Sequence, residues 1–379
     1  MKRLLLTCTD LMAIQFMVPH IKYLSENGFS VKLACSVVGD RLSDLKEALD
    51  GVAEIETVRL VRSPLAVSNL NGLKDLKRII NREKWDVIWT NEPVMGIMTR
   101  LAAKNARKRG TKVVYMVHGF HFYNGAPFLN RLLFYPAEKY CSRFSDMIIT
   151  INNEDFELAK TLHAKKVEKI DGIGVNTAEF AFNNESRNKE REELGVKDGE
   201  IMLLNVGELT KRKNQHIIID ALSLLNNPKI KFFICGRGDN EEALKSLTKE
   251  RGLENNVFFL GYRKGLSDIY SASDIFVLSS LQEGLPKAIE EAMANGKPVV
   301  CSKIRGCVDL IDDIKGGFVA ENTPESFAEA IKTLAENEDM RKNMGAYNLN
   351  NVTRFSESVS KDNVLKLMRS VLSQGGGDL

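Results

Sequence analysis

The sequence predicts an α/β protein built from two doubly wound units, each with a mainly parallel sheet. The chain has 379 residues, about twice the length of a usual domain. Short runs rich in Val and Ile alternate with longer amphipathic stretches, as in successive βα units. This alternation begins again after a polar stretch at residues 183–190. With 44% hydrophobic and 27% charged residues, the composition excludes the disordered and fibrous classes.

The first unit is predicted to span residues 1–182. Its strands are expected at residues 4–8, 31–35, 86–90, 112–117 and 147–151. Helices are expected at residues 14–27, where Gly28 follows as a helix stop, and at residues 70–84, whose polar positions are basic. Because ligands of such folds bind beyond the carboxyl ends of the strands, the loops that follow these strands are candidate sites.

The second unit is predicted to span residues 183–355, with the polar stretch as its boundary. Its strands are expected at residues 201–206, 230–235, 257–260, 274–278 and 298–301. Residues 356–379 are expected to form a final helix, which could pack back on the first unit, and a disordered glycine-rich tail. The best place for a ligand is a cleft between the two units.

The distribution of charge and the cysteine content indicate the partners and the cellular compartment to expect. Residues 1–180 hold 26 Lys and Arg against 20 Asp and Glu, whereas the remainder holds 27 against 30, so the net charge of +3 conceals a basic first half. This asymmetry fits either solvated helix faces or an anionic partner. Six scattered cysteines without Cys-x-x-Cys, and a first segment too polar for a signal peptide, predict a cytoplasmic protein without disulfides or a zinc site.

The segment that begins at Glu283 is the most informative. Gly284, Leu285 and Pro286 precede a predicted helix whose first N–H groups favour an anionic oxygen. Glu283 and Glu291 lie up to ~12 Å apart along the helix axis, too far for an acid/base pair that needs roughly 5–9.5 Å. That spacing suits two carboxylates that accept hydrogen bonds from hydroxyls at the two ends of a nucleotide sugar. A turn with a solvated carboxylate is the alternative.

Three adjacent cations follow the strand at residues 201–206. Lys211, Arg212 and Lys213 lie at its carboxyl end, where they could neutralise a diphosphate leaving group. An exposed basic turn is the alternative. Gly236 and Gly238 follow the next strand and permit a tight turn beside a phosphate or base, although the third glycine of a dinucleotide fingerprint is missing.

In the first unit, His118 and His121 follow the strand at residues 112–117. Gly119 favours a loop here, so we expect a hydrogen-bonding His118 near a sugar and a structural His121 rather than a metal site. The apolar stretch at residues 128–135 predicts either a core helix or an amphipathic surface for an anionic membrane. The chain lacks Asp-x-Asp, P-loop and Gly-x-Ser-x-Gly sequences, which excludes metal-held diphosphate sites, P-loop kinases and serine hydrolases.

Together these segments resemble the retaining glycosyltransferases of family four, over nearly the whole chain. Glu283 and Glu291 match the family's Glu-x7-Glu motif, and Lys213 matches the lysine after its Gly-x-Leu turn. Further matches, in chain order, are Gly236, Gly238, Gly261, Tyr262 and Arg263. The segments at residues 118–123 and 302–307 are similar to the bacterial branch that builds capsule, exopolysaccharide or glycan on a polyprenyl diphosphate lipid.

The resemblance implies the GT-B fold, with two Rossmann-like domains, and a metal-independent hexosyltransferase without a cofactor. The first domain would bind the acceptor and the second a nucleotide sugar, expected to be UDP-linked. Glu283 would bind the donor sugar, Glu291 the ribose and Lys213 the diphosphate. The implied catalytic residues are His118, Lys213 and Glu283. The implied donor-binding residues are Glu208, Arg212, Gly236, Gly238, Tyr262, Arg263, Gly284, Leu285, Pro286 and Glu291.

Two positions depart from the family pattern. Glu208 stands where most members have an arginine, so Lys211 or Arg212 must supply that diphosphate contact. The first loop, at residues 9–13, lacks the family's paired glycines.

The resemblance also implies partners and a location. A lipid-linked saccharide is the expected acceptor, an anionic membrane surface is a further partner, and no nucleic acid is expected. The protein would lie on the inner face of the plasma membrane. Because no carboxylate is placed as a nucleophile, we expect front-face attack, with the donor's own phosphate oxygen taking the acceptor proton. The alternatives are a UDP-sugar 2-epimerase of the same fold and a non-catalytic scaffold that binds sugar nucleotides.

Overall fold

The computed structural model describes residues 1–39 and 42–373, and the chain divides into two compact units. One unit consists of Met1–Ile173 with the described part of Ser358–Leu379, and the other is Gly174–Glu357. The division follows Ile173 rather than residue 182, because Val175 N–H donates to the Phe355 carbonyl and so joins the second unit. The tail that we expected to be disordered, residues 374–379, lies outside the described residues.

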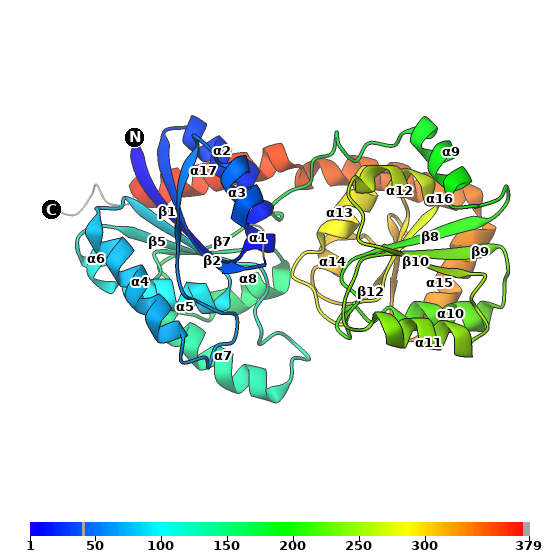
Figure 1. Ribbon diagram of the computed structural model, residues 1–379, viewed down its shortest axis with the longest axis horizontal. Coiled ribbons are helices and arrows are strands. Elements are labelled where there is room, and N and C mark those ends of the chain that lie inside the picture. Colours follow the sequence, from blue (N-terminus) through cyan, green and yellow to red (C-terminus); the bar gives the residue numbers. More distant parts are fainter. Residues whose placement is uncertain (40–41, 374–379) are drawn as a thin grey trace. The chain divides into compact units, whose positions relative to one another are not determined.

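The first unit has a parallel seven-stranded sheet (Figure 1). Its strands are β1 (Lys2–Asp10), β2 (Phe29–Val38), β3 (Ala53–Thr57), β4 (Val87–Asn91), β5 (Lys112–Val117), β6 (Met147–Thr150) and β7 (Val167–Lys169). Its helices are α1 (Leu11–Gln15), α2 (Val18–Glu26), α3 (Leu42–Ala48), α4 (Asn69–Arg82), α5 (Pro93–Ala102), α6 (Lys104–Lys108), α7 (Phe128–Cys141), the 3₁₀ turn η1 (Ser142–Phe144), α8 (Asn153–Lys160) and α17 (Glu357–Ser373). The strand order is β3-β2-β1-β4-β5-β6-β7.

The second unit has a parallel six-stranded sheet of the same kind. Its strands are β8 (Ile201–Val206), β9 (Ile230–Cys235), β10 (Val257–Gly261), β11 (Ile275–Leu278), β12 (Val299–Ser302) and β13 (Gly317–Ala320). Its helices are α9 (Asn184–Glu193), α10 (His216–Leu225), α11 (Glu241–Glu250), α12 (Leu266–Ala272), α13 (Lys287–Ala294), α14 (Cys307–Leu310), α15 (Pro324–Glu336), α16 (Glu338–Asn351) and the 3₁₀ turn η2 (Val352–Phe355). The strand order is β10-β9-β8-β11-β12-β13.

Both faces of the second sheet are buried. In β11, Ile275 and Val277 belong to one hydrophobic cluster, and Phe276 and Leu278 belong to another on the opposite face. Strands buried in this way need helices on both sides, and the prediction of two doubly wound units is confirmed. In each sheet the chain starts in the middle and continues to both sides, at β1 and at β8, which creates the switch point where such folds bind ligands.

The edge strands β3, β7 and β13 were not predicted. β3 carries Glu54 and Glu56 and has no fully buried residue, and β7 is equally half-buried. An edge strand lacks the continuous apolar run by which a central strand is identified. The helix predicted at residues 14–27 is also wrong in one respect: it is interrupted at Met17, because Pro19 in the first turn of α2 has no N–H to continue a helix.

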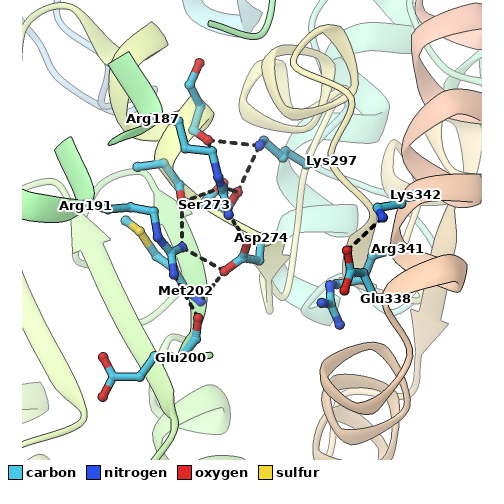
Figure 2. Close-up of polar contacts among 12 residues, drawn as sticks. Arg187, Arg191, Glu200, Met202, Ser273, Asp274, Lys297, Glu338, Arg341 and Lys342 are labelled. Atoms are coloured by element: carbon cyan, nitrogen blue, oxygen red, sulfur yellow. Dashed lines mark hydrogen bonds and ion pairs between the residues drawn. The ribbon is translucent and has the colours of Figure 1, made fainter. Parts of the chain in front are cut away.

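The polar stretch predicted as a domain boundary is instead the helix α9, a part of the second unit. Figure 2 shows how polar contacts hold it: Arg187 and Arg191 donate to the two carboxylate oxygens of Asp274, at 2.6 and 2.9 Å. Lys297 Nζ donates to the Ser273 carbonyl at 2.8 Å beside them. Burial, with repulsion from Arg187 and Arg191, lowers the pKa of Lys297 to about 7. Because these contacts are ionic, α9 needs no apolar face.

The final helix α17 packs on the first unit. His20 on α2 shares a hydrogen bond of 3.0 Å with the Ser360 hydroxyl, and Tyr23 donates to Asp362. Ser360 donates in turn to the Gly172 carbonyl at 2.8 Å. The chain therefore returns to its first unit after completing the second, as Figure 1 shows for α17 beside α2.

Candidate functional site

The loops that follow β8, β9 and β11 meet at the carboxyl edge of the second sheet. Leu281 N–H donates to the Arg212 carbonyl at 2.8 Å, which joins the loops after β11 and β8. Leu209 N–H donates to the Arg237 carbonyl at 3.0 Å, which joins the loops after β8 and β9. Residues that lie far apart in the sequence are thus held together at the switch point of this sheet.

An ion pair between Lys213 and Glu283 lies at the centre of this edge. Lys213 Nζ is 2.6 Å from Glu283 Oε1, and both side chains are largely buried. Arg212 contributes a second cation, 3.4 Å from Glu283 Oε2, and its side chain is more exposed. The Ser280 hydroxyl donates to Glu283 Oε1 at 2.6 Å. The structure therefore brings together the basic loop and the motif carboxylate that the sequence analysis singled out separately.

These partners determine the ionisation of Glu283. Burial by itself would raise the pKa of this carboxyl group, but the charges of Lys213 and Arg212 and the Ser280 hydrogen bond outweigh it. The pKa of Glu283 consequently lies below its ordinary value. A carboxylate that stays ionised in a largely buried position can accept hydrogen bonds from ligand hydroxyls.

The short segment after Glu283 leads into α13. Gly284 packs so closely on Gly306 that a Cβ at Gly306 would overlap the Gly284 carbonyl oxygen. Pro286 caps α13, which begins at Lys287, and Leu285 is half-buried before it. The helix therefore starts four residues after Glu283, directly after Pro286, as predicted from the position of the proline.

Gly236 and Gly238 lie where the loops after β8 and β9 are in close contact. A Cβ on Gly236 would overlap the Gly207 carbonyl oxygen, and one on Gly238 would overlap the Leu209 carbonyl oxygen. The two glycines therefore allow the loops after β8 and β9 to touch. Their role beside a phosphate or base stays a prediction.

The second motif carboxylate, Glu291, lies inside α13 in a different environment. The Tyr270 hydroxyl donates to Glu291 Oε2 at 2.9 Å. Burial raises the pKa of Glu291 to about 7, and the Lys287 charge and this hydrogen bond offset only part of the effect. Glu283 and Glu291 thus differ near neutral pH, because only Glu283 has cations close enough to keep it fully ionised.

Three further residues predicted to bind the donor are not part of the ion pair between Lys213 and Glu283. Glu208 is exposed in the loop after β8, where its carbonyl accepts hydrogen bonds from Gln215 Nε2 at 3.0 Å and from Thr210 N–H at 3.1 Å. Tyr262 is 47% exposed after β10. Arg263 pairs with Glu190 of α9, so its side chain helps to hold that helix.

In the first unit, His118 follows β5 and Asn91 ends β4. His118 Nε2 lies 3.0 Å from Asn91 Oδ1, and burial lowers the pKa of this imidazole, which favours its neutral form at pH 7. His121 stacks on Phe134 with ring centroids 4.5 Å apart. His118 therefore lies at the carboxyl edge of the first unit's sheet.

The interpretation of residues 128–135 as a core helix is wrong for the first turns of α7. Phe128, Leu129 and Leu132 have exposed fractions of 76, 73 and 61%. Later in the same helix, Arg100 of α5 reaches Glu138 at 2.8 Å and anchors α7 to the unit through a fully buried ion pair. The helix is therefore fixed at its end and presents an apolar face at its start.

Sequence reasoning missed Ser280, Tyr270 and Arg305. Ser280 stands three residues before Glu283, a spacing that could have suggested the contact. Arg305 Nε donates to the Glu283 carbonyl at 3.1 Å from the loop after β12, and Tyr270 reaches Glu291 from α12. These two contacts depend on tertiary packing, for which the sequence carries no local signal.

Comparisons with known proteins agree with this architecture. The family model described as glycosyl transferases group 1 matches residues 186–370, and the model described as glycosyl transferase 4-like matches residues 9–152. A relative named putative glycosyltransferase EpsD, from Bacillus subtilis, is 33% identical over 349 residues, which cover 90% of each chain. An Escherichia coli protein named UDP-Gal:alpha-D-GlcNAc-diphosphoundecaprenol alpha-1,3-galactosyltransferase is 30% identical over 327 residues, covering 84% of this chain and 83% of that one.

Solved structures share the fold. The crystal structure of Anabaena Alr3699/HepE in complex with UDP has a TM-score of 0.83 at 21% identity and covers 98% of this chain and all of that one. Sucrose-phosphate synthase from Thermosynechococcus elongatus has a TM-score of 0.80 at 16% identity, with coverage of 99% and 100%. With two Rossmann-like units, both family models matched and a 33% identical relative aligned over nine-tenths of the sequence, the chain belongs to the group 1, family-4-like glycosyltransferases of the GT-B fold.

Proposed function

We propose that this glycosyltransferase moves a hexose or N-acetylhexosamine, with retention of anomeric configuration, from a UDP-sugar to a saccharide linked to a polyprenyl diphosphate. The product would serve surface polysaccharide biosynthesis. The observation that carries the proposal is the Lys213–Glu283 pair, with Arg212 beside it, at the carboxyl edge of the second sheet. It offers a fixed carboxylate for sugar hydroxyls and two cations for a diphosphate in one place.

Similar proteins support the identity of the two substrates. Anabaena HepE is described with UDP and with UDP-glucose bound. The Escherichia coli relative is named for UDP-galactose and for a diphosphoundecaprenol acceptor, and a Campylobacter jejuni relative is likewise named for a diphospho-undecaprenol acceptor. A donor of this class needs no cofactor, and in the proposed site Lys213 and Arg212 take the part that a metal ion has in other transferases.

The proposed mechanism uses electrostatic stabilisation. The acceptor hydroxyl attacks the anomeric carbon on the face from which the diphosphate leaves, and a phosphate oxygen of the donor takes the proton. Lys213 and Arg212 stabilise the charge that develops on the diphosphate, and Glu283 holds the sugar. His118, neutral at pH 7, would be a hydrogen-bonding group for the sugar in the first unit. Glu291 would accept from the ribose hydroxyls.

We also propose that the exposed start of α7 docks on an anionic membrane at the inner face of the plasma membrane. No helix among the described residues is long and apolar enough to cross a bilayer. The exposed Phe128, Leu129 and Leu132 form an apolar surface of the kind that inserts at an interface, and Arg131 and Lys139 on the same helix are exposed as well. Such docking would bring the enzyme to a lipid-linked acceptor.

A panel of nucleotide sugars in a thermal-shift assay tests the donor. The matching UDP-sugar should raise the unfolding temperature, since a ligand at 100 times its Kd stabilises the native state by about 2.7 kcal/mol. NMR of the transfer product should then give the same anomeric configuration as the donor. No shift with any nucleotide sugar, or an inverted product, would contradict the proposal. Two other outcomes favour its rivals: epimer formed from the UDP-sugar alone indicates a 2-epimerase, and binding without turnover indicates a scaffold.

A further inference from the structure

The loop between β13 and α15 brings an asparagine to the carboxyl edge of the second sheet. Asn322 is half-buried there, two residues after the end of β13. β13 is an edge strand of this sheet, and β12 separates it from β11. The Asn322 side chain nevertheless contacts the loops that follow β8 and β11, so it joins three loops at this edge.

Both ends of the Asn322 side-chain amide form hydrogen bonds. Its Nδ2 donates to the Ser280 carbonyl at 3.2 Å, and its Oδ1 accepts from Asn214 Nδ2 at 2.9 Å. Because a carbonyl oxygen can only accept, the contact with Ser280 determines the orientation of the Asn322 amide. Asn322 is therefore a bridge of fixed direction between the loop after β11 and the loop after β8.

The two partners of Asn322 are linked to the two groups that bind Glu283 Oε1. The Ser280 hydroxyl and Lys213 Nζ both donate to this oxygen at 2.6 Å, and Asn214 is the next residue after Lys213. Asn322 thus connects the main chain that carries the hydroxyl with the residue beside the cation. Loss of this bridge would change where the cation and the hydroxyl meet the carboxylate.

The backbone directly after Lys213 has an unusual conformation. Asn214 has a φ of +57°, in the left-handed region, where asparagine is one of the few side chains that occur readily. Asn214 is 4% exposed, and its carbonyl accepts from the Ser279 hydroxyl at 2.9 Å. Its main chain is thus held by Ser279 and its side chain by Asn322. The chain that follows Lys213 is therefore fixed at two points, and Asn322 supplies one of them.

We infer that Asn322 is a positioning residue, which holds Lys213 in the place where this lysine binds a diphosphate. Asn322 acts through Asn214 and the Ser280 carbonyl, and not by contact with a substrate. The inference rests on the proposed function, because it assumes that Lys213 binds the diphosphate of the donor. A hydrogen bond weakens steeply when its distance and angle depart from the optimum, so a displaced Lys213 should bind the diphosphate less well.

A double-mutant cycle tests this role, with UDP as the probe and its binding to the full chain measured by titration calorimetry. Asn322→Ala should weaken UDP binding about three- to tenfold, the effect of one lost hydrogen bond. In a protein that already carries Lys213→Ala, the same substitution should have no further effect, because the residue that it positions is absent. A residue that only stabilises the fold would cause the same loss in both backgrounds.

Asn214→Gly approaches the same hydrogen bond from its other end. It keeps the left-handed backbone and removes the amide that Asn322 holds, so it should weaken UDP binding to a similar degree. Combined with Asn322→Ala, it should add nothing beyond the larger single effect. If Asn322→Ala does not fold, Asn214→Gly with and without Lys213→Ala decides the same question.

The matched control is Asn256→Ala. Asn256 is half-buried like Asn322, and its Nδ2 donates to the Ile230 carbonyl at 2.9 Å, at the amino ends of β9 and β10. The control therefore removes an asparagine hydrogen bond from the opposite edge of the same sheet. Asn256→Ala should bind UDP as the wild type does.

The outcomes separate this inference from the proposed function. If Lys213→Ala weakens UDP binding and Asn322→Ala does not, the positioning role is wrong and the proposed donor site stands. The same conclusion holds if Asn322→Ala costs equal affinity with and without Lys213. If the wild type does not bind UDP, or if Lys213→Ala binds it as tightly as the wild type, the proposed donor site is wrong and the positioning role is wrong with it.

Discussion

The loops at the carboxyl edges of the two sheets differ in how their polar groups are paired. In the second unit, the polar groups satisfy one another: Lys213 and Ser280 both bind Glu283, and the carboxylate stays ionised. In the first unit, Thr9 Oγ1 has no partner among the described residues, and Glu92 is strained. The second unit thus holds charged groups that already pair with one another, whereas the first unit leaves a buried hydroxyl without a partner among the described residues and a carboxylate residue at positive φ.

This difference fits two kinds of substrate. A diphosphate carries charge, so preformed cations can recognise it over a distance and stabilise it as it leaves. A saccharide is neutral, so hydroxyl-by-hydroxyl contacts and a shaped apolar wall must select it. The comparison between the units therefore predicts that charge-removing substitutions in the second unit affect chemistry, and that shape-changing substitutions in the first unit affect acceptor affinity.

The largest expected effect is that of Lys213→Ala. Removing a donor aimed at developing charge typically costs 10²–10³-fold in kcat, and we expect a loss of about that size in steady-state transfer. The substitution also leaves Glu283 with fewer cations, so the pKa of this carboxyl group should rise. Lys213→Arg keeps the charge and should recover part of the activity.

Lys249→Ala is the matched control, because Lys249 is an exposed lysine on α11, away from the loops of this edge. It should transfer sugar at the wild-type rate. An unchanged kcat in a folded Lys213→Ala protein would show that no charge on the diphosphate depends on this lysine.

The second expected effect concerns membrane binding by the first unit. Leu129→Ser with Leu132→Ser should weaken binding to vesicles that contain anionic lipid, by about tenfold per leucine, since burying a leucine contributes roughly 1.5–3 kcal/mol. Stability should hardly change, because both side chains are largely exposed. Vesicle sedimentation measures the binding, and Leu224→Ser, an exposed leucine of α10, is the control. Equal binding by the double variant would exclude α7 as the docking surface.

Sequence patterns predicted the inner strands of the two sheets better than their edge strands. The bounds expected for β5, β8 and β9 agree with the structure, because each is a continuous apolar run in the middle of a sheet. Half-buried β3 and the polar helix α9 were missed, because edge strands and ion-paired helices lack that apolar signal. Two arginines of α9 bind the Asp274 carboxylate, which lies far from them in the sequence. This tertiary contact stabilises the helix, and the polar stretch by itself does not reveal it.

The candidate sites divide in the same way. Residue type and order along the chain singled out Lys213, Glu283 and Glu291, and the structure brings the first two into contact. No sequence pattern identifies Glu92, which has a φ of +63°. The same holds for Thr9, whose hydroxyl has no partner among the described residues. Residue type therefore pointed to the charged cluster, whereas the backbone conformation of Glu92 and the buried Thr9 hydroxyl depend on tertiary structure.

The smallest expected effect is a pH dependence that separates Glu291 from Glu283. With a pKa near 7 in the folded protein, against an ordinary 4.5, Glu291 contributes stability that is complete below about pH 4.5 and lost as the pH rises through 7. Binding of UDP should change in the opposite direction, because ribose hydroxyls donate to the ionised form. The affinity for UDP should therefore rise by up to roughly tenfold from pH 6 to pH 8.

Titration calorimetry measures the affinity for UDP, and thermal unfolding measures the stability. In Glu291→Gln the part of each pH dependence that Glu291 causes should disappear, so the two curves should be flatter than those of the wild type, while Lys297 and His118 still contribute to the stability curve. Glu283, kept ionised by Lys213 and Arg212, should contribute none between pH 5 and 8. A wild-type affinity for UDP that is flat over this range would mean that Glu291 does not accept hydrogen bonds from the nucleotide.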